Sequence, residues 1–137
     1  LKEVMRLTQN NREMVLNLAL SYGSRDEIIS CIKKMMEDNL KGKLQLSELN
    51  EETISNYLFT REMPDPDLLI RTSGEYRISN FLLWQLAYTE LYFTEVLWPD
   101  FNKENLLAAI HAYQKRERRF GLTGEQAGNN RISGTTK

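Results

Sequence analysis

The fold of this chain is organised around residues 65–80, which read Asp-Pro-Asp-Leu-Leu-Ile-Arg-Thr-Ser-Gly-Glu-Tyr-Arg-Ile-Ser-Asn. The apolar run at residues 68–70 predicts a buried strand that ends directly on Arg71. A turn containing serine, glycine and glutamate follows, and Arg77 comes after it. Two guanidinium groups near the carboxyl end of a strand can bind several phosphate oxygens through charge-assisted hydrogen bonds. The stretch therefore suits a phosphorylated ligand.

The last two residues of the stretch, Ser79 and Asn80, have the composition of a helix start. Their side chains and the free backbone N–H groups of such a helix would add to an anion site. A structural interpretation is equally open. In it the arginines form ion pairs with Asp65, Asp67 or Glu75, and Ser79 only caps a helix.

Upstream of this stretch the sequence predicts a helix at the start of the chain, a loop, and then a second strand. Residues 14–20 are almost wholly apolar, which is typical of a strand covered on both faces. Ser24 and Glu27 have the spacing of a capping box at the start of a helix. The stripe expected to be buried on that helix is Ile28, Ile29, Ile32, Met35 and Met36. Gly42 is expected to end it.

The rest of the chain predicts further alternation of helices and strands. We expect one or two short helices in 47–58, a connector at 59–66, a helix at 81–87, a strand at 91–93 and a last helix from Asn102 or Lys103. Alternating elements of this kind predict an α/β fold with a mainly parallel sheet flanked by helices. Because three strands make a thin sheet with an open edge, we expect the fold to be incomplete at its N-terminal side.

The composition indicates a globular protein without a nucleic-acid partner. Hydrophobic residues make up 41% and charged residues 27% of the chain, as in ordinary soluble domains. The net charge of -1 provides no basic field for nucleic acid. No apolar run approaches the roughly 18–20 residues that span a bilayer. The expected location is cytoplasmic, at most peripheral at the inner membrane surface.

Glu90 and the basic run at residues 115–119 each allow two interpretations. Glu90 precedes an expected strand, and its carboxylate should either pair with an arginine or bind a hard cation such as Mg²⁺. The basic run is favoured at a helix C-terminus by the helix dipole, and it could also bring cations to an anionic ligand.

Four other residues that could carry chemistry favour structural roles. Cys31 is the one cysteine and lies among isoleucines, which predicts a buried, unreactive thiol. Trp84 and Trp98 are expected in the core. His111 has no partners in the sequence for a triad or a metal site.

Longer motifs add a family resemblance. Residues 64–75 read Pro-Asp-Pro-Asp-Leu-Leu-Ile-Arg-Thr-Ser-Gly-Glu, residues 77–85 read Arg-Ile-Ser-Asn-Phe-Leu-Leu-Trp-Gln, and Glu-Leu-Tyr-Phe and Trp-Pro-Asp-Phe follow at 90–93 and 98–101. These motifs resemble those of the cis-prenyltransferases, and among them the bacterial undecaprenyl diphosphate synthases. Residues 18–28 resemble that family's Asn-Tyr-Gly-Gly-Arg segment, with Ser21 and Ser24 as departures.

The resemblance implies the cis-prenyltransferase fold and a Mg²⁺-dependent transferase. Members of the family add isopentenyl diphosphate units in cis to an allylic diphosphate, usually farnesyl diphosphate. In the bacterial enzymes the product, undecaprenyl diphosphate, is delivered to the membrane as the lipid carrier for cell-wall glycans. The family also implies a homodimer. Residues 1–121 would form the C-terminal half of one domain, and residues 122–137 are predicted to be a disordered tail.

The family's site residues carry over position by position. The substrate-binding positions are Arg71, Arg77, Ile78, Ser79, Arg119 and Gly121, and the Mg²⁺ ligand is Glu90. Arg119 and Gly121 match an Arg-x-Gly end that reaches toward the partner's diphosphate site in the homodimer. Tyr76 stands where some members have a histidine near the metal, which is a departure from the family's pattern.

The resemblance places no catalytic residue in this chain. The family's catalytic Asp and the residues that grip the allylic diphosphate are expected upstream of Leu1, and the chain alone is therefore predicted to be inactive. The alternative is a non-catalytic partner subunit of a cis-prenyltransferase, although such subunits tend to lose the arginine clamp. A different kind of nucleotide-binding domain would need a Gly-rich phosphate loop, which the sequence lacks.

Overall fold

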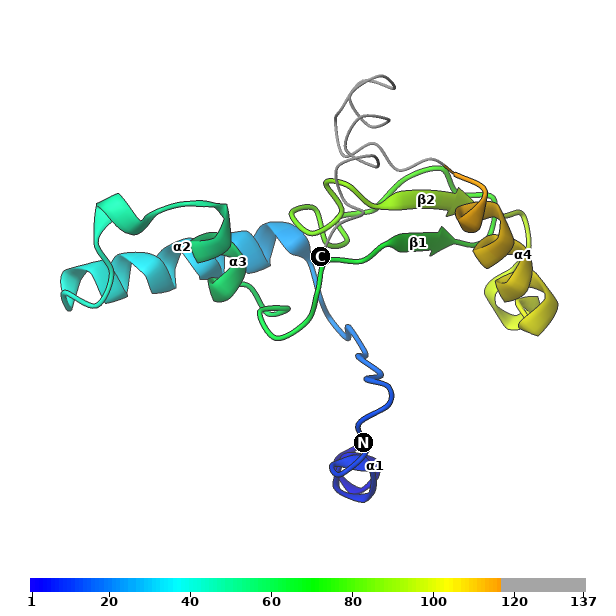
Figure 1. Ribbon diagram of the computed structural model, residues 1–137, viewed down its shortest axis with the longest axis horizontal. Coiled ribbons are helices and arrows are strands. Elements are labelled where there is room, and N and C mark those ends of the chain that lie inside the picture. The colour runs from blue at the N-terminus through cyan, green and yellow to red at the C-terminus, as the bar shows by residue number, and fades with distance from the viewer. Residues whose placement is uncertain (117–137) are drawn as a thin grey trace, which may run out of the picture.

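A parallel two-stranded sheet joins the two sides of the structure, a computed structural model that describes residues 1–116. Its strands are β1 (Leu68–Arg71) and β2 (Glu90–Phe93). The helices are α1 (Lys2–Thr8), α2 (Ser24–Leu40), α3 (Glu51–Tyr57) and α4 (Lys103–Gln114), and the 3-10 turns are η1 (Leu46–Glu48) and η2 (Trp98–Asp100). The pair α2 and α3 extends to one side of the sheet and α4 lies on the other (Figure 1). This confirms the α/β class with a parallel sheet flanked by helices.

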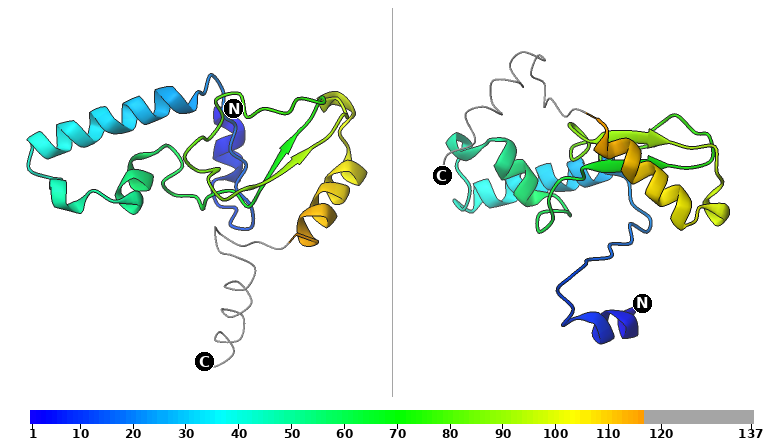
Figure 2. Two further views of the ribbon diagram at one scale, coloured as in Figure 1. Left: turned by 90° about the horizontal axis from the view of Figure 1, so that it is seen from above. Right: turned by 45° about the vertical axis from the view of Figure 1, so that its right-hand side comes forward.

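The two strands run parallel, so both end at the same edge of the sheet. Leu68 lies opposite Glu90, and Arg71 lies opposite Phe93. The helix α4 packs against β2, and Figure 2 shows it beside the strands from two further directions. The carboxyl ends of both strands therefore face the same way, toward the turn that follows Arg71.

Several helix boundaries follow the local signals in the sequence. Asn50 caps α3 by accepting a hydrogen bond from the Thr53 N–H at 2.8 Å. Asn102 caps α4 in the same way through the Asn105 N–H, at 3.2 Å. Gly42 follows the end of α2 with a φ of 70°, a left-handed conformation that glycine adopts without strain. These ends were predictable because each cap is made within a few residues.

The prediction of a strand at residues 14–20 is wrong, and with it the prediction of three strands. Met14, Val15 and Leu16 are 79%, 80% and 76% exposed, and the segment runs away from the sheet toward α1 (Figure 1). A strand needs a neighbour that accepts its backbone hydrogen bonds. Within residues 1–116 no strand lies beside this segment, so its apolar pattern alone does not produce one.

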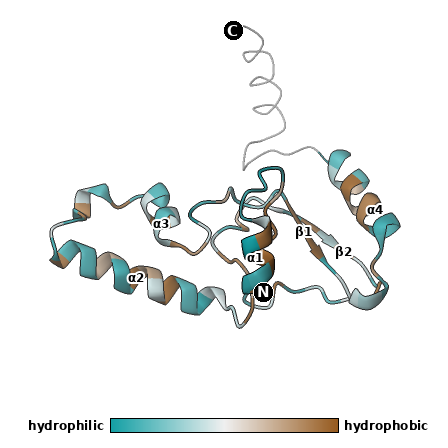
Figure 3. Ribbon diagram, turned by 90° about the horizontal axis from the view of Figure 1, so that it is seen from below, coloured by the Kyte–Doolittle hydropathy of each residue, from teal (hydrophilic) through white to brown (hydrophobic). Residues whose placement is uncertain are grey.

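The predicted buried stripe of α2 is also mostly wrong. Ile29 and Ile32 are each 51% exposed and Met36 is 62% exposed, whereas Ser24, Glu27 and Cys31 are buried. The brown, apolar positions of α2 alternate with teal ones in Figure 3. The helix packs mainly against the short α3, which covers only a narrow face of it.

Residues 81–87 do not form the predicted helix, and Ser79 and Asn80 do not begin one. Ser79, Asn80 and Leu82 have φ values of 52°, 62° and 46°. Left-handed residues cannot continue a right-handed helix, and each costs roughly 1–2 kcal/mol relative to the ordinary conformation. The segment is instead a series of turns.

The hydrophobic core of the described residues is small. Its buried apolar side chains are Cys31, Leu44, Leu58, Leu86 and Ala109. The predicted burial of Cys31 is confirmed, and burial raises the pKa of its thiol. Trp84 is half-buried and donates to the Ser55 hydroxyl at 3.2 Å, but Trp98 is 72% exposed, so the prediction of a core position is wrong for Trp98. His111 is exposed on α4.

Candidate functional site

The carboxyl edge of the sheet continues beyond the strands as a network of backbone hydrogen bonds. The Thr94 N–H donates to the Arg71 carbonyl, and the N–H groups of Ser73 and Gly74 donate to Val96 and Thr94, all at 2.9 Å. Gly74 has a φ of 63°, and a Cβ there would collide with the Glu95 carboxylate. The turn that follows Arg71 is thus held closely against the end of β2.

Arg71 is half-buried at this edge, and its Nε is buried without a hydrogen-bond partner. It lines a hollow of about 590 Å³, within the range of small-molecule sites. The same hollow is lined by Lys103 at the start of α4 and by the apolar side chains of Trp98, Phe101 and Leu106. Two cations beside an apolar wall can accommodate a ligand with an anionic head and a short hydrocarbon tail.

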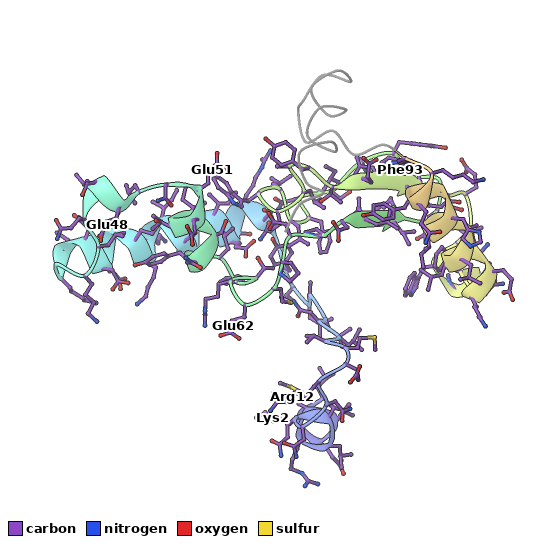
Figure 4. The ribbon with its side chains drawn as sticks, in the orientation of Figure 1. Lys2, Arg12, Glu48, Glu51, Glu62 and Phe93 are labelled. Atoms are coloured by element: carbon purple, nitrogen blue, oxygen red, sulfur yellow. The ribbon has the colours of Figure 1, made fainter. Side chains whose placement is uncertain are left out.

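The sequence did not predict Lys103, Phe101 or the exposed Trp98 as residues beside Arg71. The two rings are stacked with centroids 6.2 Å apart. Trp98 and Phe101 belong to the Trp-Pro-Asp-Phe motif, which was the available signal, but spacing does not show that η2 brings them beside Arg71. Phe93, at the end of β2 opposite Arg71, is labelled in Figure 4.

Arg77 is not among the residues that line this hollow. Its side chain is 65% exposed and forms an ion pair with Glu75. The structure thus shows one of the ion pairs that the sequence left open. An exposed pair of this kind contributes at most about 1 kcal/mol, so it leaves the guanidinium available to an anionic ligand.

Glu90 lies at the other end of the strands from Arg71. Glu90 is opposite Leu68, which is three residues before Arg71. Three residues of a strand correspond to a distance along it of about 10 Å. Glu90 Oε2 accepts a hydrogen bond from the Arg116 guanidinium at 2.7 Å, and both side chains are partly exposed. In the part of the chain that the structure describes, no group of three or more His, Cys, Asp or Glu side chains could hold a metal. Glu90 is therefore a single carboxylate with a cationic partner.

Tyr76 is tied to the end of β2. Its hydroxyl donates to Glu95 Oε1 at 2.9 Å, and its ring lies 5.2 Å from that of Phe93. The hydrogen bond to Glu95, with the charge of that carboxylate, raises the pKa of Tyr76. The residue is therefore a neutral hydrogen-bond donor in this structure.

Asn80 caps a helix, but the helix is α2 rather than the one expected to follow it. Its carbonyl accepts from the Ser24 N–H at 2.8 Å, and its Oδ1 accepts from the Arg25 N–H at 3.0 Å. Ser24 is not the N-cap, which is Gly23, and its Oγ accepts from the Leu83 N–H at 2.9 Å. The predicted capping box is therefore wrong, because Ser24 bonds to a distant segment.

Glu27, the other half of the predicted capping box, is 1% exposed and serves as a buried acceptor. It accepts from the Tyr22 hydroxyl, from the Phe59 N–H at 2.7 Å and from Gln85 Nε2 at 3.3 Å. Burial, followed by the bond to Glu27, raises the pKa of Tyr22. No local pattern indicates this network, since Phe59 and Gln85 are far from Glu27 along the chain.

The remaining predicted site residues are placed as follows. Ile78 is half-buried and Ser79 is exposed, both in the turn before Asn80. Arg119 and Gly121 lie outside the described residues, as does the tail predicted at 122–137. No helix in residues 1–116 is both long and apolar enough to cross a bilayer.

Comparison with known proteins gives matches over most of the chain. Residues 1–121 match the prenyltransferase family described as "Putative undecaprenyl diphosphate synthase". An isoprenyl transferase of Bacillus cereus is 56% identical over 121 residues, which are 88% of this chain and 47% of that protein. A tritrans,polycis-undecaprenyl-diphosphate synthase (geranylgeranyl-diphosphate specific) of Thermoplasma acidophilum is 54% identical over 118 residues, or 86% of this chain and 46% of that protein. The chain thus spans about half the length of the curated relatives it matches.

Two solved structures have the same fold over the matched part. Lavandulyl diphosphate synthase from Lavandula x intermedia, in complex with dimethylallyl diphosphate, gives a TM-score of 0.84 at 41% identity, over 88% of this chain and 52% of that chain. A probable undecaprenyl diphosphate synthase from Campylobacter jejuni gives a TM-score of 0.73 at 40% identity, over 88% of this chain and 53% of that chain.

Proposed function

Since the chain belongs to the undecaprenyl diphosphate synthase family of prenyltransferases, we propose that the edge of the sheet at Arg71 binds isopentenyl diphosphate as part of a transferase. That transferase would add isopentenyl units in cis to an allylic diphosphate such as farnesyl diphosphate. Its product would be undecaprenyl diphosphate, made in the cytoplasm and delivered to the membrane as a carrier for cell-wall glycans. A homodimer would be the working assembly.

The observation that carries the proposal is the buried, unpartnered Nε of Arg71, a residue that lines a hollow together with a second cation and apolar side chains. A buried donor without a partner is costly, and a diphosphate oxygen would satisfy it. Lys103 adds a second positive charge, and Trp98 and Phe101 offer a surface for the five-carbon isopentenyl group.

The other substrate contacts are proposed from the family positions. Arg77 and Ser79 would reach the diphosphate from the turn after β1, with Ile78 contacting the substrate between them. Arg119 and Gly121 would act across the dimer toward the partner's diphosphate site. The exposed ion pair of Arg77 with Glu75 would be exchanged for contacts to phosphate oxygens.

Glu90 is the proposed Mg²⁺ ligand, and the described residues fit this role only in part. Mg²⁺ is commonly bound through one or two carboxylates together with substrate phosphates and water, so a single carboxylate is compatible with it. Arg116 now neutralises that carboxylate at 2.7 Å and would have to release at least one oxygen. A bound Mg²⁺ would offset the negative charge of the diphosphate groups.

Titration calorimetry of the 137-residue chain with isopentenyl diphosphate tests the binding part of this proposal. We expect saturable binding of the diphosphate that weakens as salt is raised, because the contacts are charge-assisted. Isopentenol, which has the same hydrocarbon group without the diphosphate, is the matched control and should bind far more weakly. Equal binding of the two compounds, or no binding of either, would contradict the proposal.

The proposed transferase activity requires residues of the family's chain that the 137-residue chain does not match. The catalytic Asp is proposed to be one of them, so the 137-residue chain alone should incorporate no radiolabelled isopentenyl diphosphate into polymer. A chimera that joins this chain to the remaining part of the Bacillus cereus isoprenyl transferase should be active. An inactive but folded chimera would favour a non-catalytic partner subunit, and robust polymer from the chain alone would refute the division of the site.

A further inference from the structure

The first turn of α2 is hydrogen-bonded to the turn at residues 77–83, which contains the proposed substrate contacts Arg77 and Ser79. Asn80 accepts from the N–H groups of Ser24 and Arg25 through its carbonyl and its side chain, at 2.8 and 3.0 Å. Ser24 Oγ returns a contact by accepting from the Leu83 N–H at 2.9 Å. The first N–H groups of a helix have no partner within it, so the two bonds to Asn80 satisfy groups of α2 that would otherwise lack a partner.

The segment held in this way has a backbone that would not form by itself. Ser79, Asn80 and Leu82 are all left-handed, with φ between 46° and 62°. Strained backbone of this kind persists only where the surrounding structure determines it, and it is concentrated at ligand-binding sites. Ser79 is itself a proposed substrate contact, and Arg77 lies two residues before it.

The buried carboxylate of Glu27 also connects α2 to this segment. Glu27, one turn along α2 from Ser24, accepts from Tyr22, Phe59 and Gln85. It is 1% exposed, and no cation pairs with it within residues 1–116. A buried charge without a cation is tolerated only when several donors surround it. Glu27 therefore joins α2 to the segment at Gln85 and to the end of α3.

The fit between the two segments is close. A Cβ on Gly23 would lie 2.9 Å from Asn80 Nδ2 and 3.2 Å from Asp26 Oδ2. A side chain at this position would therefore push against Asn80. The rings of Tyr22 and Phe81 pack edge to face with centroids 5.8 Å apart, which adds an apolar contact between the same two segments.

We propose that Ser24, Glu27 and Asn80 are positioning residues, which hold the turn at residues 77–83 in the shape that binds the diphosphate. The inference rests on the proposed function, since it assigns a purpose to the contact between α2 and that turn. None of the three residues needs to touch the substrate. They act through the backbone of Ser79 and through the place where the Arg77 side chain begins.

The test compares Asn80→Ala with Asn50→Ala in the 137-residue chain. Asn50 caps α3 with a bond of 2.8 Å to the Thr53 N–H, so its loss destabilises a helix end that is not part of the turn. At a temperature where circular dichroism shows each variant folded, Asn80→Ala should raise the Kd for isopentenyl diphosphate about tenfold, the effect of one lost hydrogen bond. Asn50→Ala should leave the Kd unchanged. Asn80→Asp keeps the side-chain acceptor and should restore binding.

A second measurement does not use the ligand. Amide hydrogen exchange of residues 77–83 should become faster in Asn80→Ala and in Ser24→Ala, which removes the acceptor for the Leu83 N–H, and should be unchanged in Asn50→Ala. Unchanged exchange and unchanged affinity in both Asn80→Ala and Ser24→Ala would overturn the positioning role. Equal loss of affinity in Asn80→Ala and Asn50→Ala would overturn it as well.

The two proposals fail in distinguishable ways. If the unsubstituted chain does not bind isopentenyl diphosphate, the proposed ligand is wrong and the positioning role falls with it, even if exchange shows that Asn80 orders the turn. If the unsubstituted chain binds and Arg71→Ala does not, while Asn80→Ala and Ser24→Ala bind normally, the diphosphate site stands and only the positioning role is wrong.

Discussion

Replacement of Arg71 with alanine is expected to weaken binding of isopentenyl diphosphate about 10- to 100-fold. A hydrogen bond to a charged group contributes about 1.5–3 kcal/mol, and about 1.4 kcal/mol corresponds to one factor of ten in affinity. Arg71→Lys keeps the charge without the planar fork of donors and should recover only part of the loss. Arg77→Ala should act in the same direction. Titration calorimetry on the 137-residue chain measures each Kd.

The matched control for the arginine substitutions is Arg61→Ala. Arg61 is an exposed arginine in the connector between α3 and β1, so its removal lowers the net charge by the same amount away from the site. Its Kd should stay within about twofold of that of the unsubstituted chain. If Arg61→Ala weakens binding as much as Arg71→Ala, the attraction is a general charge effect and the hollow beside Arg71 is not the site.

The largest expected effect on stability comes from Leu58→Ala. Leu58 is 1% exposed and is the largest fully buried apolar side chain among residues 1–116. Truncation of a buried leucine usually lowers the free energy of unfolding by about 2–5 kcal/mol, because apolar contacts are lost and a cavity remains. Leu58 borders an open apolar groove between α2 and α3, into which neighbours can relax, so a value near the lower end is expected. Urea unfolding followed by circular dichroism gives the difference.

Leu46→Ala is the control for this measurement. Leu46 is a leucine in η1 that is 74% exposed, and its truncation should change the free energy of unfolding by no more than about 0.5 kcal/mol. Comparable losses in the two variants would show that Leu58 is not part of a packed core in solution.

The correct predictions share a physical cause, which is that each segment has the partner that its pattern requires. The stop at Gly42 and the caps at Asn50 and Asn102 find that partner within a few residues, and the strand that ends at Arg71 pairs with the strand at 91–93. The family could also be predicted, because its motifs are long and lie in one continuous stretch. The substrate-binding roles of Arg71, Arg77, Ile78 and Ser79 and the metal role of Glu90 stay predictions, and Arg119 and Gly121 lie outside the described residues.

The wrong predictions share a cause as well. Residues 14–20 have the composition of a strand, yet no strand within residues 1–116 accepts their hydrogen bonds. The apolar stripe of α2 has the right period, yet little packs against it. In each case a pattern describes what a segment could bury or pair with, and whether a partner is present is decided elsewhere in the chain.

The sequence was sufficient to predict the family, the strands that end at Arg71 and Phe93, and the turn with Arg77 that follows Arg71. The tertiary structure alone decided that Asn80 caps α2, that Ser24 and Glu27 bond to the segment after the turn, and that Trp98 and Lys103 lie beside Arg71. The physical reason is the distance along the chain. The bond from Arg25 to Asn80 spans 55 residues and that from Leu83 to Ser24 spans 59, and no local preference or period encodes such a pair.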